Sequence, residues 1–157
     1  MKNIIYLLCG LPGSGKTTYA KSLESRATIR LSLDEEVFKR YGRDFDSSKY
    51  QEYEEQTEQD LSNIIKSSIY SGHDVILDYG FWRKQKRDKY KQIATDFGSV
   101  WKLIYFNCPL NILKKRLISR NKTIKDDSQV VTVQMLSNFI KNFEAPIREG
   151  EETKDNT

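Results

Sequence analysis

Long apolar runs are absent from this 157-residue sequence, and residue types that mark several special classes of protein are scarce. No apolar segment approaches the roughly 20 residues that a membrane-spanning helix needs. The two cysteines, Cys9 and Cys108, lie in or beside apolar runs without metal-ligand spacing, so we expect buried, reduced thiols. The single histidine, His73, follows a glycine and is expected in a solvated turn. These absences, with no pattern of a secretion signal, favour a cytoplasmic protein that has no membrane segment.

Charge is distributed unevenly along the chain, although the net charge is only +4. Residues 34–60 contain ten acids against four bases, a balance of −6, whereas residues 83–125 contain thirteen bases against two acids, a balance of +11. Most of these bases fit solvated helix faces, but their concentration also suits an anionic ligand such as a nucleotide.

Four apolar runs alternate with segments of helical pattern, which predicts a parallel sheet covered on both faces. We expect a single α/β domain over residues 1–148 with a three-layer α/β/α fold. No convincing fifth strand is present, and residues 149–157 are expected to form a frayed polar tail. The expected strands are residues 3–9, 27–33, 74–80 and 100–107, and the expected helices are 16–25, 35–41, 48–71, 84–97, 109–120 and 132–143.

The stretch "GLPGSGKTTYA" after the first strand matches the phosphate-binding pattern G-x-x-x-x-G-K-[ST]. Glycines let successive backbone N–H groups wrap phosphate oxygens, and the following helix presents its positive end to them. We therefore expect a P-loop NTPase that binds ATP or GTP, with Lys16 reaching the β- and γ-phosphates and the Thr17 hydroxyl ligating Mg²⁺. The predicted nucleotide-binding residues are Gly10, Pro12, Gly13, Ser14, Gly15, Lys16, Thr17 and Thr18.

Two aspartates follow predicted strands, and ligands of open parallel sheets bind at the carboxyl ends of the strands. Asp34 comes at the end of the second run and Asp78 at the end of the third. In a strand order 2-3-1-4, Asp78 would lie beside Thr17 and the metal, while Asp34 would lie one strand further out, near an acceptor hydroxyl. We predict that Asp34 is the catalytic base and that Asp78 serves the metal; an N-cap role for Asp34 is compatible with this.

Aromatic residues follow Asp78 in "YGFWR". Tyr79, Phe81 and Trp82, with the adjacent Arg83, are candidates for a substrate wall; packing under the next helix is the alternative. Tyr50 and Tyr53, on the long predicted helix, are interpreted as packing residues.

The segment "LKKRLISRNKTIKDDS" predicts a helix that runs into a polar insert before the next helix. Arg116 and Arg120 are four residues apart and therefore share a helix face. Arginine binds phosphate oxygens bidentately and stabilises charge as it moves. We predict a small helical lid at about residues 116–132 with these arginines as catalytic groups; a solvated basic helix is the alternative.

These pieces, with "FEAP" near residue 145, resemble small P-loop kinases of the group that holds zeta toxins, chloramphenicol phosphotransferase and the polynucleotide 5′-kinase domain. The resemblance runs over nearly the whole chain. It implies that Lys16 and Thr17 are the Walker pair, that Asp34 is the general base, and that Arg116 and Arg120 are the lid arginines.

The sequence departs from this group on the acceptor side. Val37 stands where polynucleotide kinase has an arginine three residues after its base, although Lys39 and Arg40 are nearby. After Asp78, Tyr79-Gly80-Phe81-Trp82 replaces the Thr-Asn pair that many relatives have. We therefore expect an Mg²⁺-dependent kinase that phosphorylates a hydroxyl of a small molecule. A polynucleotide 5′-hydroxyl kinase, which would bind nucleic acid, is the less favoured alternative, and a regulatory module with slow ATPase activity is another.

Overall fold

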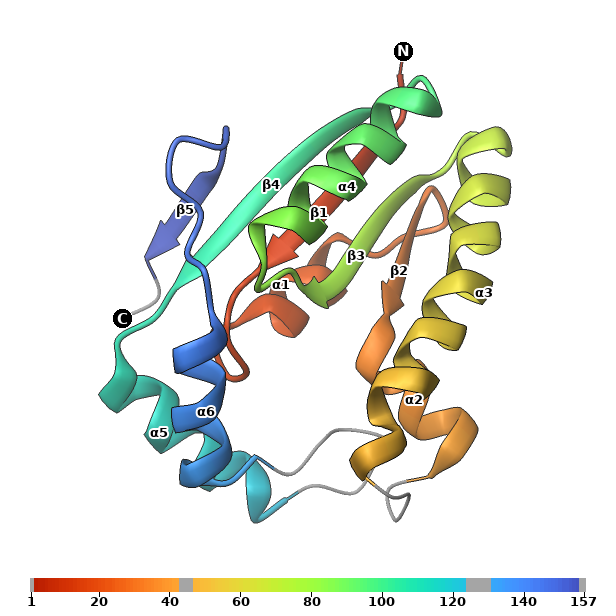
Figure 1. The fold of residues 1–157 in the computed structure, drawn as a ribbon. Helices are drawn as coiled ribbons and strands as arrows, with labels where there is room; N and C mark the ends of the chain where they lie inside the picture. The colour runs from red at the N-terminus through yellow and green to blue at the C-terminus, as the bar shows by residue number, and fades with distance from the viewer. Residues whose placement is uncertain (1, 43–46, 124–130, 156–157) are drawn as a thin grey trace.

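A five-stranded parallel sheet forms the centre of the protein in a computed structural model that describes residues 2–42, 47–123 and 131–155 (Figure 1). The strand order is β2-β3-β1-β4-β5, and each neighbouring pair is parallel. The predicted order 2-3-1-4 is confirmed, and a fifth strand extends it beyond β4. The strands are β1 (Ile4–Cys9), β2 (Thr28–Ser32), β3 (Asp74–Gly80), β4 (Val100–Asn107) and β5 (Glu152–Asp155).

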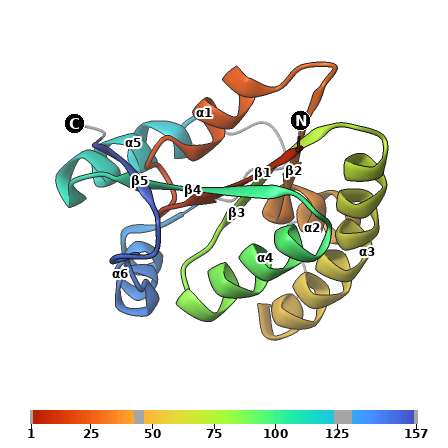
Figure 2. The same cartoon turned by 90° about the horizontal axis from the view of Figure 1, so that it is seen from above.

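Helices cover both faces of the sheet, which confirms the predicted three-layer fold. Figure 2 shows α1 and α5 on one side of the sheet and α3, α4 and α6 on the other. In the described residues, no helix is both long enough and apolar enough to cross a membrane. The helices are α1 (Lys16–Leu23), α2 (Leu33–Tyr41), α3 (Tyr50–Tyr70), α4 (Lys84–Asp96), α5 (Leu110–Asn121) and α6 (Val133–Asn142), with a 3₁₀ turn at Ser47–Lys49.

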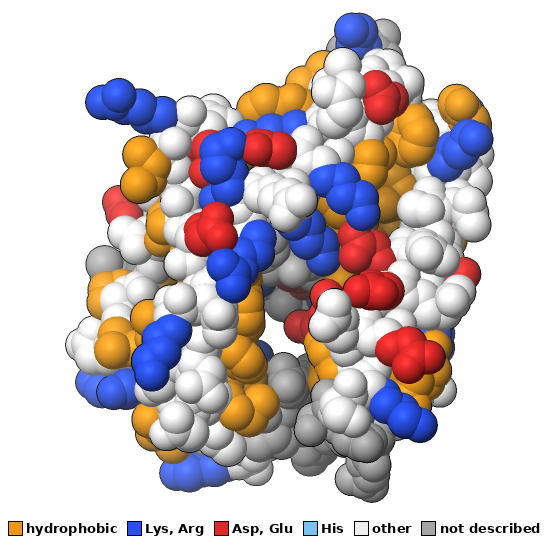
Figure 3. All heavy atoms as spheres, viewed as in Figure 1, with side chains coloured by type: hydrophobic (Ala, Val, Ile, Leu, Met, Phe, Trp, Pro, Cys, Tyr) orange, Lys and Arg blue, Asp and Glu red, His pale blue; other side chains and the backbone are white. Residues whose placement is uncertain are grey.

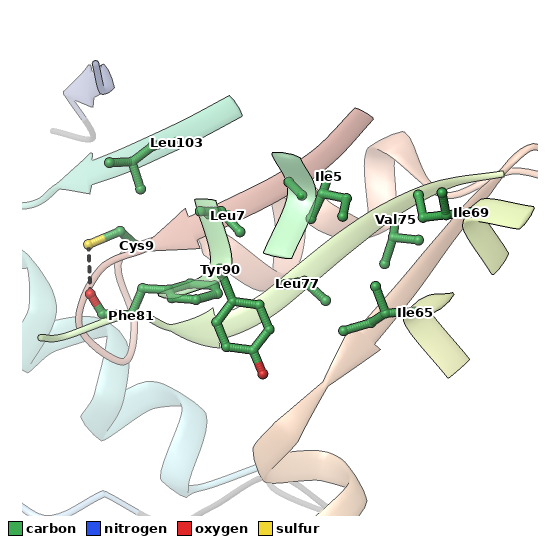
Figure 4. Packing of buried hydrophobic residues seen from close by; sticks show 11 residues of the cluster. Ile5, Leu7, Cys9, Ile65, Ile69, Val75, Leu77, Phe81, Tyr90 and Leu103 are labelled. Atoms are coloured by element: carbon green, nitrogen blue, oxygen red, sulfur yellow. Dashed lines mark hydrogen bonds between the residues drawn. The ribbon is translucent and has the colours of Figure 1, made fainter. Parts of the chain in front are cut away.

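Two apolar clusters hold these layers together because successive side chains of a strand point to opposite faces. On the α3 and α4 side, Ile5 and Leu7 of β1 pack with Ile65 and Tyr90, all at most 2% exposed (Figure 4). On the opposite side, Leu8, Ile76, Ile104 and Phe106 pack with Ala20 of α1. The buried strands hold the loops at their carboxyl ends in fixed positions relative to one another.

The carboxyl-terminal segment is ordered by specific contacts, and the expectation of a frayed tail is wrong for residues 149–155. Strand β5 pairs with β4 from Ile104↔Glu152 to Asn107↔Asp155. Before it, Glu149 forms a bidentate ion pair with Arg87 of α4, with both N···O distances 2.9 Å and side-chain exposures of 5% and 1%. The side chains of β5 are mostly exposed at this edge of the sheet, so its sequence "ETKD" shows no apolar run.

Candidate active site

The loop between β1 and α1 has the backbone of a phosphate-binding loop. Gly13 and Gly15 adopt φ angles of +83° and +103°, which residues with a Cβ rarely reach. Gly15 is the N-cap of α1 and makes no side-chain cap, and the first turn of α1 contains no acidic residue. The positive end of this helix is therefore available to an anion.

Lys16 leaves the start of α1 and folds back over this loop. Its Nζ donates a hydrogen bond to the carbonyl oxygen of Leu11 at 2.9 Å. Desolvation lowers the pKa of Lys16, whereas the carboxylates of Asp78 and Asp34 raise it. The lysine thus lies within electrostatic reach of both aspartates that the sequence singles out.

Thr17 and Asp78 are in direct contact, as the strand order predicts. The Thr17 hydroxyl donates to Asp78 Oδ2 at 2.8 Å, and Arg30 Nη2 of β2 donates to the same oxygen at 2.9 Å. Arg30 is in turn held by Glu35 of α2 through two hydrogen bonds of 2.8 Å. Asp78 therefore orients Thr17 while its charge is balanced by arginine, which suits an outer position around a metal rather than direct ligation.

The donor set fits Mg²⁺, which keeps several waters and takes only one or two protein ligands together with substrate phosphates. The described residues contain no group of three or more His, Cys, Asp or Glu side chains that could hold a metal ion on their own. The Thr17 hydroxyl at the start of α1 would be the direct ligand of such an ion, and Asp78 would hold this hydroxyl from behind.

Asp34 is the second residue of α2, and the N-cap of that helix is Ser32, whose hydroxyl accepts from the Glu35 N–H. The considered N-cap role for Asp34 is therefore not found. Its carboxylate accepts a hydrogen bond from the Tyr50 hydroxyl of α3. Asp34 is exposed to solvent in part. The protein that surrounds the rest of the side chain raises the pKa of Asp34 by desolvation, whereas the Tyr50 hydrogen bond and the charge of Lys16 lower it; desolvation is the larger effect.

Tyr50 begins a row of polar side chains on α3 that the sequence interpretation missed. Residues 50, 54 and 58 are spaced four apart and share one helix face. Lys86 of α4 lies 3.5 Å from Glu58 and 4.0 Å from Glu54, measured from Nζ to the nearer carboxylate oxygen. The four-residue spacing is visible in the sequence and indicates that the three residues share one face of the helix. The sequence alone does not indicate that this helix face lies next to Asp34.

The aromatic segment after Asp78 divides into three different environments. Phe81 is 1% exposed and packs in the core at φ +48°, so the structure corrects its assignment to a substrate wall in favour of the packing alternative. Trp82 donates its Nε1–H to the carbonyl of Gly10 at 3.3 Å and its ring packs on Phe139. Tyr79 is half-buried under Lys86, whose Nζ lies 5.6 Å from the ring centroid.

Arg83 precedes α4 and contacts the end of α6 and the segment after it. It forms an ion pair of 2.9 Å with Glu144 and donates to Asn142, which joins α4 to the segment after α6. The ion pair is exposed to solvent on both side chains, and the assignment of Arg83 to the substrate stays a prediction.

The two arginines of the predicted lid both lie on α5. Arg116 Nη1 donates to the carbonyl of Gly13 in the phosphate loop at 3.2 Å. The positive charge of Arg120 acts on Lys16 and lowers its pKa. Residues 124–130, the middle of the predicted lid, lie outside the described residues, so the lid itself stays a prediction.

These groups lie on elements that meet at the carboxyl end of the sheet. Figure 1 places α5 and α6 on one side of this end and α2 and the start of α3 on the other. The space-filling view shows an opening between the two sides, with acidic side chains gathered beside it toward α2 and α3 (Figure 3). The arrangement brings an anion-binding loop, a hydroxyl beside a carboxylate, a base candidate and arginines to one place.

A parallel sheet, a phosphate loop and this set of side chains define a nucleotide-binding domain of the P-loop kinase class. The chain belongs to the family described as "AAA domain", whose model matches residues 5–146.

Two curated relatives and a solved structure support this placement. L-seryl-tRNA(Sec) kinase of Methanococcus maripaludis is 26% identical over 147 residues, which are 91% of this chain and 53% of that protein, so the chain spans about half of that relative. Uridylate kinase of Saccharomyces cerevisiae is 27% identical over 166 residues, covering 97% of this chain and 79% of the relative. A crystal structure from Chloroflexus aurantiacus, assigned to a kinase, matches with a TM-score of 0.75 at 17% identity, covering 99% of this chain and 89% of that one. The family and these relatives support nucleotide binding and phosphoryl transfer in general.

Proposed function

We propose that this protein transfers the γ-phosphoryl group of ATP to a hydroxyl group of a small molecule, with Asp34 as the general base. The observation that supports this most directly is the place of Asp34 in the fold: Ser32 at the end of β2 pairs with Asp78, which binds Thr17, so Asp34 follows β2 at the same end of the sheet as the phosphate loop. The lysine that would bind the β- and γ-phosphates and the carboxylate that would receive the acceptor proton also act on each other's pKa. A phosphoryl group held between them would meet a hydroxyl that Asp34 orients.

The donor side would use the backbone of the phosphate loop, Lys16 and the arginines of α5. Lys16 would exchange its bond with the Leu11 carbonyl for one with phosphate, and Arg116 is already at Gly13. Mg²⁺ would be held by the Thr17 hydroxyl, oriented by Asp78, and would neutralise charge on the phosphates. GTP would fit the same phosphate contacts.

In the transfer step the acceptor oxygen forms a bond to the γ-phosphorus as the bond to the bridging oxygen of ADP breaks. The acceptor proton passes to Asp34, and ADP leaves with the electron pair of the broken bond. The charge that spreads over the phosphoryl oxygens would be stabilised by Lys16, Arg116 and Arg120.

A nucleic-acid acceptor is less well supported than a small molecule. The position three residues after Asp34 is Val37, which is 0% exposed and packs with Leu33 and Leu61. The apolar side chain of Val37 therefore offers no charged group for an acceptor phosphate. A 5′-hydroxyl oligonucleotide is therefore a required negative control rather than the expected substrate.

The test is ATP-dependent phosphorylation of a library of small hydroxyl compounds, read by mass spectrometry together with ADP release. We expect at least one phosphorylated small molecule, formed by the natural protein and not by Asp34→Asn. Glu36→Gln, which changes the same charge in the same first turn of α2, serves as the matched control and should retain activity. Phosphorylation of the oligonucleotide alone, or ADP release with no phosphorylated product, would overturn the proposal.

A further inference from the structure

Arg30 of β2 contacts two carboxylates that belong to different sides of the candidate site. Its Nη2 donates to Asp78 Oδ2 at 2.9 Å and to Glu35 Oε1 at 2.8 Å, and its Nη1 donates to Glu35 Oε2 at 2.8 Å. The side chains of Arg30 and Asp78 are 9% and 4% exposed, whereas that of Glu35 is 37% exposed. The guanidinium group therefore bridges the end of β3 and the first turn of α2.

The register of the sheet explains why this arginine reaches Asp78. Arg30 pairs with Ile76, and the next pair on the same sheet face is Ser32 with Asp78, because residues two apart on a strand share a face. Asp78 is thus the diagonal neighbour of Arg30. The same guanidinium also reaches Glu35, because α2 begins directly after β2 (Figure 1).

On the donor side, the bridge ends at the phosphate loop. The Asp78 oxygen that accepts from Arg30 also accepts from the Thr17 hydroxyl, at 2.8 Å. Because two donors share one oxygen, a change in the position of Thr17 acts on Arg30 through a single atom.

On the acceptor side, the bridge ends beside the proposed base. Glu35 directly follows Asp34 in the first turn of α2. Farther into the molecule, Leu33 and Val37 of this helix pack with Leu61 of α3. Besides these apolar contacts, the charged bridge attaches the start of α2 to the polar end of β3.

Charge balance accounts for only one half of this bridge. The buried carboxylate of Asp78 needs a cation, which Arg30 supplies. Glu35 is partly exposed and would be solvated without the arginine, and an ion pair of this kind contributes little to stability. Its two parallel hydrogen bonds with Arg30 instead give the contact a fixed geometry.

We propose that Arg30 and Glu35 are positioning residues that couple Thr17 to Asp34, so that nucleotide binding at the phosphate loop also orders the start of α2. This inference rests on the proposed function and adds a connection between its donor and acceptor sides. Neither residue would touch the reacting atoms. They would act through Asp78 on one side and through the backbone of α2 on the other.

Hydrogen–deuterium exchange tests this connection without an acceptor. The protein is compared with and without Mg²⁺ and AMPPNP, a non-hydrolysable ATP analogue, in peptides that cover residues 33–41. In the natural protein we expect exchange in α2 to slow about fivefold or more on binding. In Glu35→Gln the affinity for the nucleotide should remain nearly unchanged, but this slowing should be lost. The matched control is Glu36→Gln, which changes a carboxylate of the same turn that pairs with Arg40 and should behave as the natural protein does.

The outcomes separate this inference from the proposed function. Nucleotide binding without slower exchange in α2, or equal slowing in Glu35→Gln, would overturn the inference and leave the proposed function standing. Absence of nucleotide binding by the natural protein would overturn the proposed function itself.

Kinetics on an acceptor from the library of hydroxyl compounds separate positioning from stability. Arg30→Lys keeps a positive charge beside Asp78, but an ammonium group cannot reproduce the planar fork that binds both carboxylates. We expect Arg30→Lys and Glu35→Gln each to lower kcat about tenfold or more with an unchanged KM for ATP, since the base is displaced. The double variant should lose no more than the weaker single variant, because either change breaks the same bridge. Losses that multiply, or an unchanged kcat in the single variants, would contradict the positioning role.

Discussion

Thr17 at the start of α1 donates its hydroxyl hydrogen to Asp78 at the end of β3, and Arg30 of β2 holds the same carboxylate oxygen. Three elements are joined at one atom because β3 lies between β2 and β1 in the sheet. Asp78 thus fixes the position of the Thr17 hydroxyl. If this hydroxyl ligates Mg²⁺, as we propose, its position is set before the metal binds.

Asp78→Asn tests this arrangement. The amide can still accept from Thr17, but the negative charge behind the metal position is removed. We expect the Mg²⁺ concentration for half-maximal activity to rise several-fold, measured by titrating Mg²⁺ at saturating ATP. An unchanged Mg²⁺ dependence would assign Asp78 to folding alone.

Arg30→Met should destabilise the fold by about 3 kcal/mol, because it leaves the Asp78 carboxylate, 4% exposed, without its cation. Urea unfolding measures this change. The double variant Arg30→Met/Asp78→Asn should recover part of the loss, because no buried charge remains unpaired. If the loss of unfolding free energy in the double variant equalled the sum of the losses in the two single variants, Arg30 and Asp78 would not be coupled.

Lys16→Ala should abolish detectable Mg-nucleotide binding or reduce it by orders of magnitude, because the phosphates lose their main side-chain cation. Isothermal titration calorimetry on folded protein checks this. Lys21→Ala, which removes an exposed lysine of the same helix, should bind as the natural protein does. Equal affinity in the two variants would remove Lys16 from the nucleotide site.

Asp34→Asn should lower turnover by about 10² to 10⁴ and leave nucleotide affinity nearly unchanged, which is the usual contribution of a general base. A wild-type rate, with chemistry shown to be rate-limiting, would require another base.

The pH dependence of kcat should report the raised pKa of Asp34. A base is active when deprotonated, so activity should fall with decreasing pH already above the range of an ordinary aspartate. Tyr50→Phe removes a hydrogen bond that lowers this pKa, so the acid limb should move to still higher pH. Tyr53→Phe keeps the ring that stacks on Tyr41 and is the matched control, with no shift expected. A shift to lower pH in Tyr50→Phe would contradict the role of the Tyr50 hydroxyl.

Four strands could be predicted from the sequence, because apolar strand runs and the glycine-rich loop are local signals. Their order and the contact between Thr17 and Asp78 followed from the P-loop class that this loop indicates. Strand β5 could not be predicted, since its polar residues are held at an edge by pairing with β4. Phe81 was misplaced because its burial depends on a left-handed backbone conformation and on Tyr90, which come together only in the folded chain. Tyr50 and Glu54 show a helix face in the sequence, but only the packing of α3 next to α2 brings that face to Asp34.

The pairing of Arg87 with Glu149 has a consequence for biosynthesis. Arg87 also donates to the carbonyl of Phe81 at 2.8 Å, and the same carbonyl accepts from the Cys9 thiol at the end of β1, directly before the nucleotide loop. The carboxylate that balances Arg87 lies 62 residues downstream. During synthesis, the phosphate loop can therefore form at the end of β1 before Arg87 has its counter-charge, because Glu149 is synthesised later. The nucleotide site gains its final support only after residue 149 has left the ribosome.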